Sequence, residues 1–215
     1  ATMRNIRARG ADDLRAVVSQ AGDKFELDLY HPVGRLPTDM SGLLLWSRDG
    51  KLSKELSSPK RGLVHCFEAE VRGAVDATKL REALRGGVRI GIAGFEEVRH
   101  ADLETSEFVP DAPLQDPRSR ITVATRDAGS KVRQVLKACG HPVVTLRRTR
   151  IGLLSVDDVA ESGLAAATEE EEAWLRELAG LPPMRRRSPQ ASYPRWLQSV
   201  DLPQLPAPAV PAGSA

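Results

Sequence analysis

The sequence predicts a mixed α/β protein, because short strand-like patterns alternate along the chain with short helical ones. Its 215 residues are 41% hydrophobic and 28% charged, a composition that favours a folded chain over a disordered one. The length suits one sizeable domain. No apolar run in the sequence approaches the roughly 18 residues of a membrane helix, so we expect no membrane partner.

The first predicted elements lie before residue 60. Residues 12–20 have a helical pattern that ends at Gly22. Residues 43–46 form a continuous apolar run, which predicts a buried strand, and an Arg-Asp-Gly turn follows at residues 48–50. Residues 51–57 carry two leucines four positions apart, as one face of a short helix requires.

The middle of the chain continues this alternation. Residues 66–71 alternate apolar and polar side chains and predict a half-buried strand. Residues 76–85 predict a helix, with Asp76 as its N-cap and two glycines as its stop. Residues 88–92 alternate again. Three prolines predict a loop over residues 109–119.

The last third contains two further strands and two helices. Residues 120–125 and 142–146 predict strands. Between them, residues 131–139 place their apolar side chains on one helical face. Residues 169–178 predict a helix whose opening glutamates suit its N-terminal dipole. The Pro-rich tail over residues 183–215 has little periodicity, and we expect it to be extended and ordered only against a partner.

The small net charge of +2 conceals an uneven distribution. Residues 118–150 carry nine basic side chains and one acidic side chain, whereas residues 151–182 carry one basic and eight acidic. A dense basic block of this kind is expected where one face meets a polyanion such as RNA. The alternative is a solvated surface that the following acidic segment neutralises within the fold.

Cysteine and histidine spacing predicts neither a metal site nor a cofactor. Cys66 and Cys139 lie far apart with no CxxC pair, so no disulfide framework or thiolate zinc site is indicated. The cysteine usage favours a reducing compartment. Because the chain begins at Ala1, as a processed precursor or an incomplete sequence would, we expect an organellar matrix (mitochondrion or plastid) and otherwise the cytoplasm.

Four segments in a consistent order resemble one enzyme family. They read VGRLPTDMSGLLL at residues 33–45, HCFEAEVRG at 65–73, a third segment at 126–143 that ends in CGHPV, and RIGLL at 150–154. They are similar to the motifs of RNA pseudouridine synthases, in particular the ribosomal RsuA-type group. Those motifs read approximately GRLDxDTSGLLL, KxYxVxVxG, EGRNRQVRRM with a later LGHPV, and RIGxL. The resemblance implies a mixed, largely antiparallel sheet flanked by helices.

The same resemblance implies a reaction on RNA that needs no metal or cofactor. The family isomerises uridine in RNA and uses the aspartate of its Arg-Leu-Asp motif on a flipped-out nucleotide. Here that position is Pro37, which has no ionisable group. Asp39 would be the catalytic carboxylate only if the protein is an active enzyme. Two residues of extended chain advance about 6.6 Å, so the Asp39 carboxylate is displaced from the position of the motif aspartate. The alternative for Asp39 is a turn-capping or salt-bridging carboxylate.

Two further positions depart from the family pattern. The motif tyrosine is Phe67, which keeps the stacking surface but loses the hydroxyl. The arginine of Glu-Gly-Arg, which the resemblance implies as a partner of the catalytic aspartate, is Ala128. Met40 replaces a family threonine, and we expect it to pack. The three departures at Pro37, Phe67 and Ala128 predict a pocket released from catalysis, so no catalytic residue is expected.

The retained residues predict RNA contact with little sequence specificity. The predicted RNA-binding residues are Arg35, Ser41, Phe67, Arg126, Lys131, Arg133, Lys137, Arg147, Arg148 and Arg150. For each cation, the alternative is a solvated surface charge.

We expect four segments: an N-terminal extension (1–30), a pseudouridine-synthase-like domain (31–160), an acidic helix (161–182) and the Pro-rich tail (183–215). The leading hypothesis is an inactive pseudoenzyme that binds structured RNA, such as rRNA, as a component or assembly factor of a ribosome or other ribonucleoprotein. Ribosomal or other ribonucleoprotein proteins would contact the tail. The alternatives are an active rRNA pseudouridine synthase and a protein-interaction scaffold that no longer meets RNA.

Overall fold

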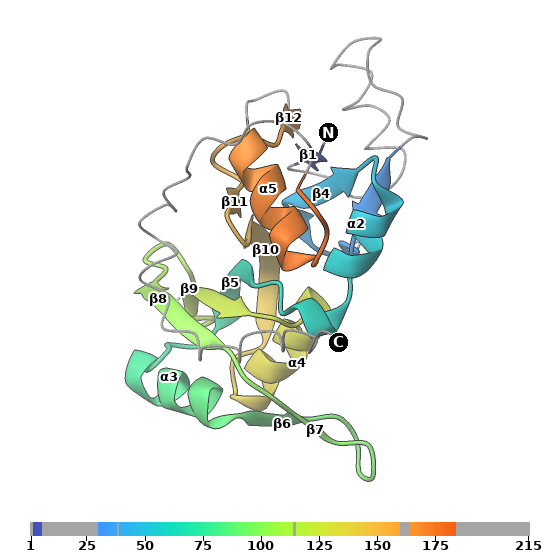
Figure 1. Cartoon of the computed structure of the whole chain (residues 1–215). Helices are drawn as coiled ribbons and strands as arrows, with labels where there is room; N and C mark the ends of the chain where they lie inside the picture. Colours follow the sequence, from blue (N-terminus) through green and yellow to red (C-terminus); the bar gives the residue numbers. More distant parts are fainter. Residues whose placement is uncertain (1, 6–29, 38, 114, 160–163, 184–215) are drawn as a thin grey trace.

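The computed structural model describes residues 2–5, 30–37, 39–113, 115–159 and 164–183. The helix predicted over residues 12–20 lies outside these residues, and so does nearly all of the tail predicted over 183–215. The described chain forms two main sheets with helices packed against them (Figure 1).

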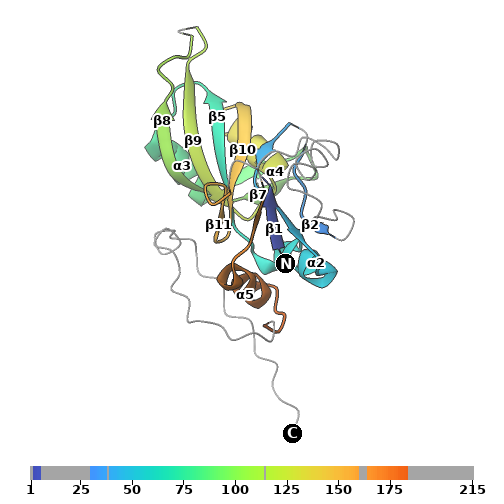
Figure 2. The same cartoon turned by 90° about the horizontal axis from the view of Figure 1, so that it is seen from above.

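The larger sheet is mixed and mostly antiparallel. Its order is β11-β10-β5-β9-β8, and β3 pairs in parallel with β10. The strands are β3 (Ser41–Gly42), β5 (His65–Arg72), β8 (Asp102–Phe108), β9 (Arg118–Thr125), β10 (Val143–Ile151) and β11 (Leu154–Ser155). Figure 2 shows β8, β9, β5 and β10 side by side.

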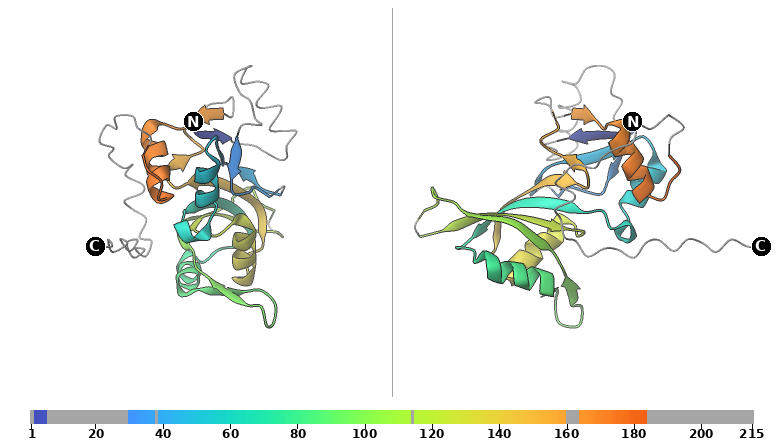
Figure 3. Two further views of the ribbon diagram at one scale, coloured as in Figure 1. Left: turned by 45° about the vertical axis from the view of Figure 1, so that its right-hand side comes forward. Right: turned by 60° about the vertical axis from the view of Figure 1, so that its left-hand side comes forward.

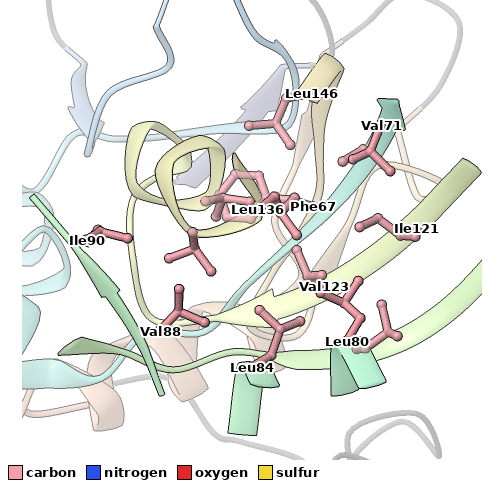
Figure 4. Close-up of a cluster of buried hydrophobic side chains, with 14 of the residues drawn as sticks. Phe67, Val71, Leu80, Leu84, Val88, Ile90, Ile121, Val123, Leu136 and Leu146 are labelled. Atoms are coloured by element: carbon pink, nitrogen blue, oxygen red, sulfur yellow. The ribbon is translucent and has the colours of Figure 1, made fainter. Parts of the chain in front are cut away.

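Two helices cover one face of this sheet. They are α3 (Ala77–Gly86) and α4 (Gly129–Ala138), seen on the same side of the strands in Figure 3. Leu84 of α3 and Leu136 of α4 are fully buried against Phe67 and Val71 of β5 and Val123 of β9 (Figure 4). The hairpin of β6 (Val88–Ile90) and β7 (Glu97–Arg99) extends from the end of α3.

The second sheet has the order β12-β1-β4-β2. Its strands are β1 (Thr2–Asn5), β2 (His31–Val33), β4 (Leu44–Ser47) and β12 (Leu164–Ala166), and the helices beside it are α2 (Gly50–Leu56), η2 (Pro59–Arg61) and α5 (Glu169–Leu178). Leu45 of β4, Leu52 of α2 and Leu175 of α5 are fully buried in its core.

This second sheet crosses the boundaries that we drew from sequence. Residues of β1, before residue 31, pair with β4, and β12, after residue 160, pairs with β1. Helix α5 buries Leu175 against the same core. The described parts of the expected N-terminal extension and acidic helix are therefore integrated with the pseudouridine-synthase-like segment, because backbone pairing between distant strands leaves no local signal in sequence.

Local signals placed most of the helices correctly. Asp76 caps α3 as expected, its side chain accepting hydrogen bonds from the backbone N–H groups of Thr78 and Lys79 at 3.1 Å. Asp49 caps α2 in the same way. Thr168 and Glu171 form a capping box at the start of α5. Within the described residues, no helix has the length and apolarity needed to cross a membrane.

Candidate functional site

The loop between β2 and β4 brings the first motif onto the edge of the larger sheet. The backbone carbonyl of Pro37 accepts a hydrogen bond from the Met40 N–H at 3.0 Å, and Ser41 and Gly42 then pair with Arg147 and Arg148 of β10. Gly42 has φ +112°, and a Cβ atom there would lie 2.2 Å from the Arg148 carbonyl oxygen. Only glycine permits this close approach of two backbones.

The carboxylate of Asp39, two residues after Pro37, faces outward from this loop. Asp39 is exposed, and its Oδ2 lies 2.9 Å from Nε of Arg133 on α4. Arg133 also donates from Nη2 to the Asp39 carbonyl at 2.8 Å. This geometry is that of the salt-bridging alternative, in which Asp39 anchors the loop to α4. Pro37 is half-buried and offers no acid, base or donor.

Met40, Phe67 and Gly129 meet where the three motifs converge. A Cβ atom on Gly129, the first residue of α4, would lie 2.3 Å from Sδ of Met40 and 3.2 Å from Cε1 of Phe67. The Phe67 ring is fully buried, and Met40 is 3% exposed. The expectation that Met40 packs is confirmed. Because the Phe67 ring is fully buried, an RNA base cannot stack on it in this conformation, and the predicted RNA contact through Phe67 does not fit its position.

Helix α4 begins without a side-chain cap. Its N-cap is Ala128, which stands at the motif arginine position and makes no capping hydrogen bond. The preceding Asp127 accepts a hydrogen bond from Nη1 of Arg99 at 2.9 Å, and Arg126 is exposed. Arg126, Arg99 and His100 line a cavity of about 540 Å³ beside this helix end.

Arg148 and His65 lie on the inner face of the sheet next to Phe67. Arg148 is 4% exposed and donates from Nε to the Leu43 carbonyl at 2.8 Å. Burial lowers the pKa of its guanidinium to about 10. Burial, together with the positive charge of Arg148, lowers the pKa of His65 to about 3. His65 is therefore neutral at physiological pH. Sequence reasoning assigned Arg148 to surface phosphate binding, and its burial does not fit that role.

The remaining predicted RNA-binding cations divide into two groups. Lys131 pairs with Glu97 of β7, and Arg150 pairs with Glu104 of β8. Arg35, Lys137 and Arg147 are exposed, like Arg126. Arg147 lies opposite the half-buried Ser41 in the β3–β10 register. The structure thus brings Ser41 and Arg147 together. Lys137 is exposed in the last turn of α4, four residues after Arg133.

Comparison with known proteins agrees with this architecture. The chain is 29% identical over 174 residues to a ribosomal large subunit pseudouridine synthase B of Bacillus subtilis, covering 81% of this chain and 68% of the relative. It is 33% identical to the protein of the same name from Pasteurella multocida, covering 70% of this chain and 41% of the relative. It is 31% identical to an uncharacterized RNA pseudouridine synthase of Mycobacterium tuberculosis, covering 71% of this chain and 56% of the relative.

A solved structure described as a pseudouridylate synthase has the same fold. Its TM-score is 0.62 at 21% identity, and the match covers 82% of this chain and 73% of that chain. No protein-family model matches the chain. The fold and the homologues together establish that this chain resembles the RNA pseudouridine synthases. Two of the three relatives are named as ribosomal large subunit pseudouridine synthases, and for two of the three the chain spans only about half of their length.

Proposed function

We propose that this protein is a catalytically inactive, RNA-binding relative of the ribosomal pseudouridine synthases, and that it acts as a component or assembly factor of a ribosome or another ribonucleoprotein. The observation that carries the proposal is the full burial of Phe67 at the motif tyrosine position, together with a proline at the position of the motif aspartate. Chemistry on a uridine requires the base to leave the RNA stack and enter a pocket. The Phe67 ring is fully buried and offers no exposed face for that base to stack on.

The carboxylate arrangement supports the same conclusion. Pro37 cannot act on a nucleotide, and the Asp39 carboxylate contacts Arg133 at the surface. A reacting group has to be placed to within about 0.5–1 Å of its target. Exposure of Asp39 is the one observation that favours the alternative, an active synthase that uses this second aspartate.

Exposed cations beside the first motif support RNA binding. Arg35 and Arg147 present their side chains to solvent, and Arg147 lies across the strand pair from Ser41. Arginines in such positions bind phosphates and position the RNA without reading its sequence. The names of the relatives refer to the ribosomal large subunit, so rRNA of that subunit is the RNA we propose. Contact of proteins with the tail over residues 183–215 remains part of the proposal.

Pseudouridine mapping tests the catalytic half of the proposal. The full chain is incubated with large subunit rRNA transcripts, beside the Bacillus subtilis relative as a positive control. We expect no pseudouridine above background. Pseudouridine that disappears in Asp39→Ala would instead establish the active synthase.

RNA binding is tested separately by charge reversal. Arg147→Glu is compared with Lys54→Glu, an exposed lysine on α2 with the same change in charge. We expect Arg147→Glu to weaken rRNA binding and to reduce the slope of log affinity against log salt concentration by about 1. Equal weakening by both variants, or binding that does not depend on salt, would contradict a specific RNA interface at this edge of the sheet.

A further inference from the structure

A buried guanidinium without a counter-ion among the described residues lies on the inner face of the larger sheet. Arg148 donates from Nε to the Leu43 carbonyl, but its Nη2 is buried and has no hydrogen-bond partner among the residues that the structure describes. No carboxylate of the residues that the structure describes forms an ion pair with it. Buried cations are normally paired, because an isolated charge out of water carries a large free-energy cost.

A second unpartnered polar atom lies on the same face of the sheet. Arg148 is directly opposite Phe67 in the β5–β10 register, and His65 precedes Phe67 by two residues. Directly opposed residues and residues two apart project to the same face, so Arg148 and His65 are diagonal neighbours. The Nδ1 atom of His65 is buried and has no hydrogen-bond partner in the described part of the chain.

We propose that Arg148 and His65 bind a small oxyanion, with Arg148 Nη2 and the Nδ1–H of a neutral His65 as donors. The ligand is a phosphate or carboxylate group, and it balances the charge of Arg148, which forms no ion pair with a carboxylate of the described residues. A buried water molecule would satisfy the donors but would leave the charge uncompensated. The low pKa of His65 keeps its ring neutral, so the site carries one positive charge. This inference does not depend on whether the protein isomerises uridine.

Anion-dependent stability tests the site. Thermal unfolding of the full chain is followed at fixed pH and ionic strength while inorganic phosphate replaces chloride. Because a ligand that binds only the folded state stabilises it by mass action, we expect the unfolding equilibrium constant to fall about tenfold for each tenfold rise in phosphate above its Kd. In Arg148→Met this dependence should be lost. In Lys54→Met, which removes an exposed cation on α2, it should be retained.

Phosphate also stabilises folded proteins in general. This general stabilisation is the same in the wild type and in both variants, so the comparison of the three chains removes it. If Arg148→Met does not fold, Arg148→Lys keeps the charge but loses the planar fork, and its half-saturating phosphate concentration should be at least tenfold higher. A parallel titration with uridine monophosphate in place of inorganic phosphate distinguishes a nucleotide phosphate from a free oxyanion as the ligand. A lower half-saturating concentration than that of inorganic phosphate assigns the site to a nucleotide phosphate, and an equal or higher one assigns it to a free oxyanion.

Equal phosphate dependence in the wild type and Arg148→Met would overturn the proposal. The absence of any phosphate dependence in the wild type would also overturn it.

Discussion

The Sδ atom of Met40 lies 2.3 Å from the position that a Cβ atom on Gly129 would occupy. These residues are 89 positions apart, yet the Met40 side chain packs against the start of α4 in the core cluster that contains Phe67. The first residue of α4 must lack a side chain for the thioether to lie there. The packing at this place therefore depends on both residues together.

Gly129→Ala should destabilise the protein by about 1–3 kcal/mol through overpacking. In a Met40→Ala background the added methyl has room, so its cost should fall, and the coupling in a double-mutant cycle should be about 0.5–3 kcal/mol. Urea unfolding of the four chains measures this. Gly86→Ala at the end of α3, where a Cβ atom meets nothing within 4 Å, is the control and should be close to neutral. Additive costs would contradict the contact.

Asp39→Ala should lower the free energy of unfolding by no more than about 1 kcal/mol, because the ion pair with Arg133 is exposed on the aspartate side. Denaturant unfolding at low and high salt measures the change. Arg133→Met removes the same ion pair and also the hydrogen bond to the Asp39 carbonyl, so it should cost more. A loss of several kcal/mol in Asp39→Ala would show that the carboxylate has a partner beyond Arg133.

The stability of the protein should depend on pH through His65. Its pKa is about 3 in the folded state against an ordinary value of 6.5, so between these values the unfolded chain binds the extra proton. The contribution of His65 is fully present above pH 6.5 and is lost as pH falls toward 3. His65→Leu should therefore flatten the rise of unfolding free energy with pH in this window, by up to about 1.4 kcal/mol per pH unit. Equal slopes in both chains would contradict a neutral, buried His65.

Cys66 should resist alkylation in the folded protein. Burial, followed by the charge of Glu104, raises the pKa of its thiol to about 12, and only the thiolate is a good nucleophile. In a Cys139→Ser background, iodoacetamide at pH 8 should label Cys66 slowly in buffer and rapidly in denaturant, as mass spectrometry would measure. Rapid labelling of the folded chain would mean that β5 opens locally.

Local sequence patterns made part of the fold around the site predictable. Asp76 as a cap, the apolar face of α4 and the alternation of β5 depend on neighbours within a few positions, and the structure confirms each of them. The stretch over residues 97–108 escaped prediction. It contains β7 and β8, whose residues are largely half-buried or exposed and show no clear alternation.

The sequence by itself determined which chemical groups the first and third motifs contain. Pro37, Phe67 and Ala128 are read directly from it, and with them the absence of an ionisable group at the motif aspartate. Only the tertiary structure decided which side chains are accessible. Arg147 and Arg148 are adjacent arginines in an unremarkable basic run, yet one is exposed and the other buried. The physical reason is the pleat of β10, which turns successive side chains to opposite faces, and the long-range pairing of β10 with β3 and β5 that determines which face is covered.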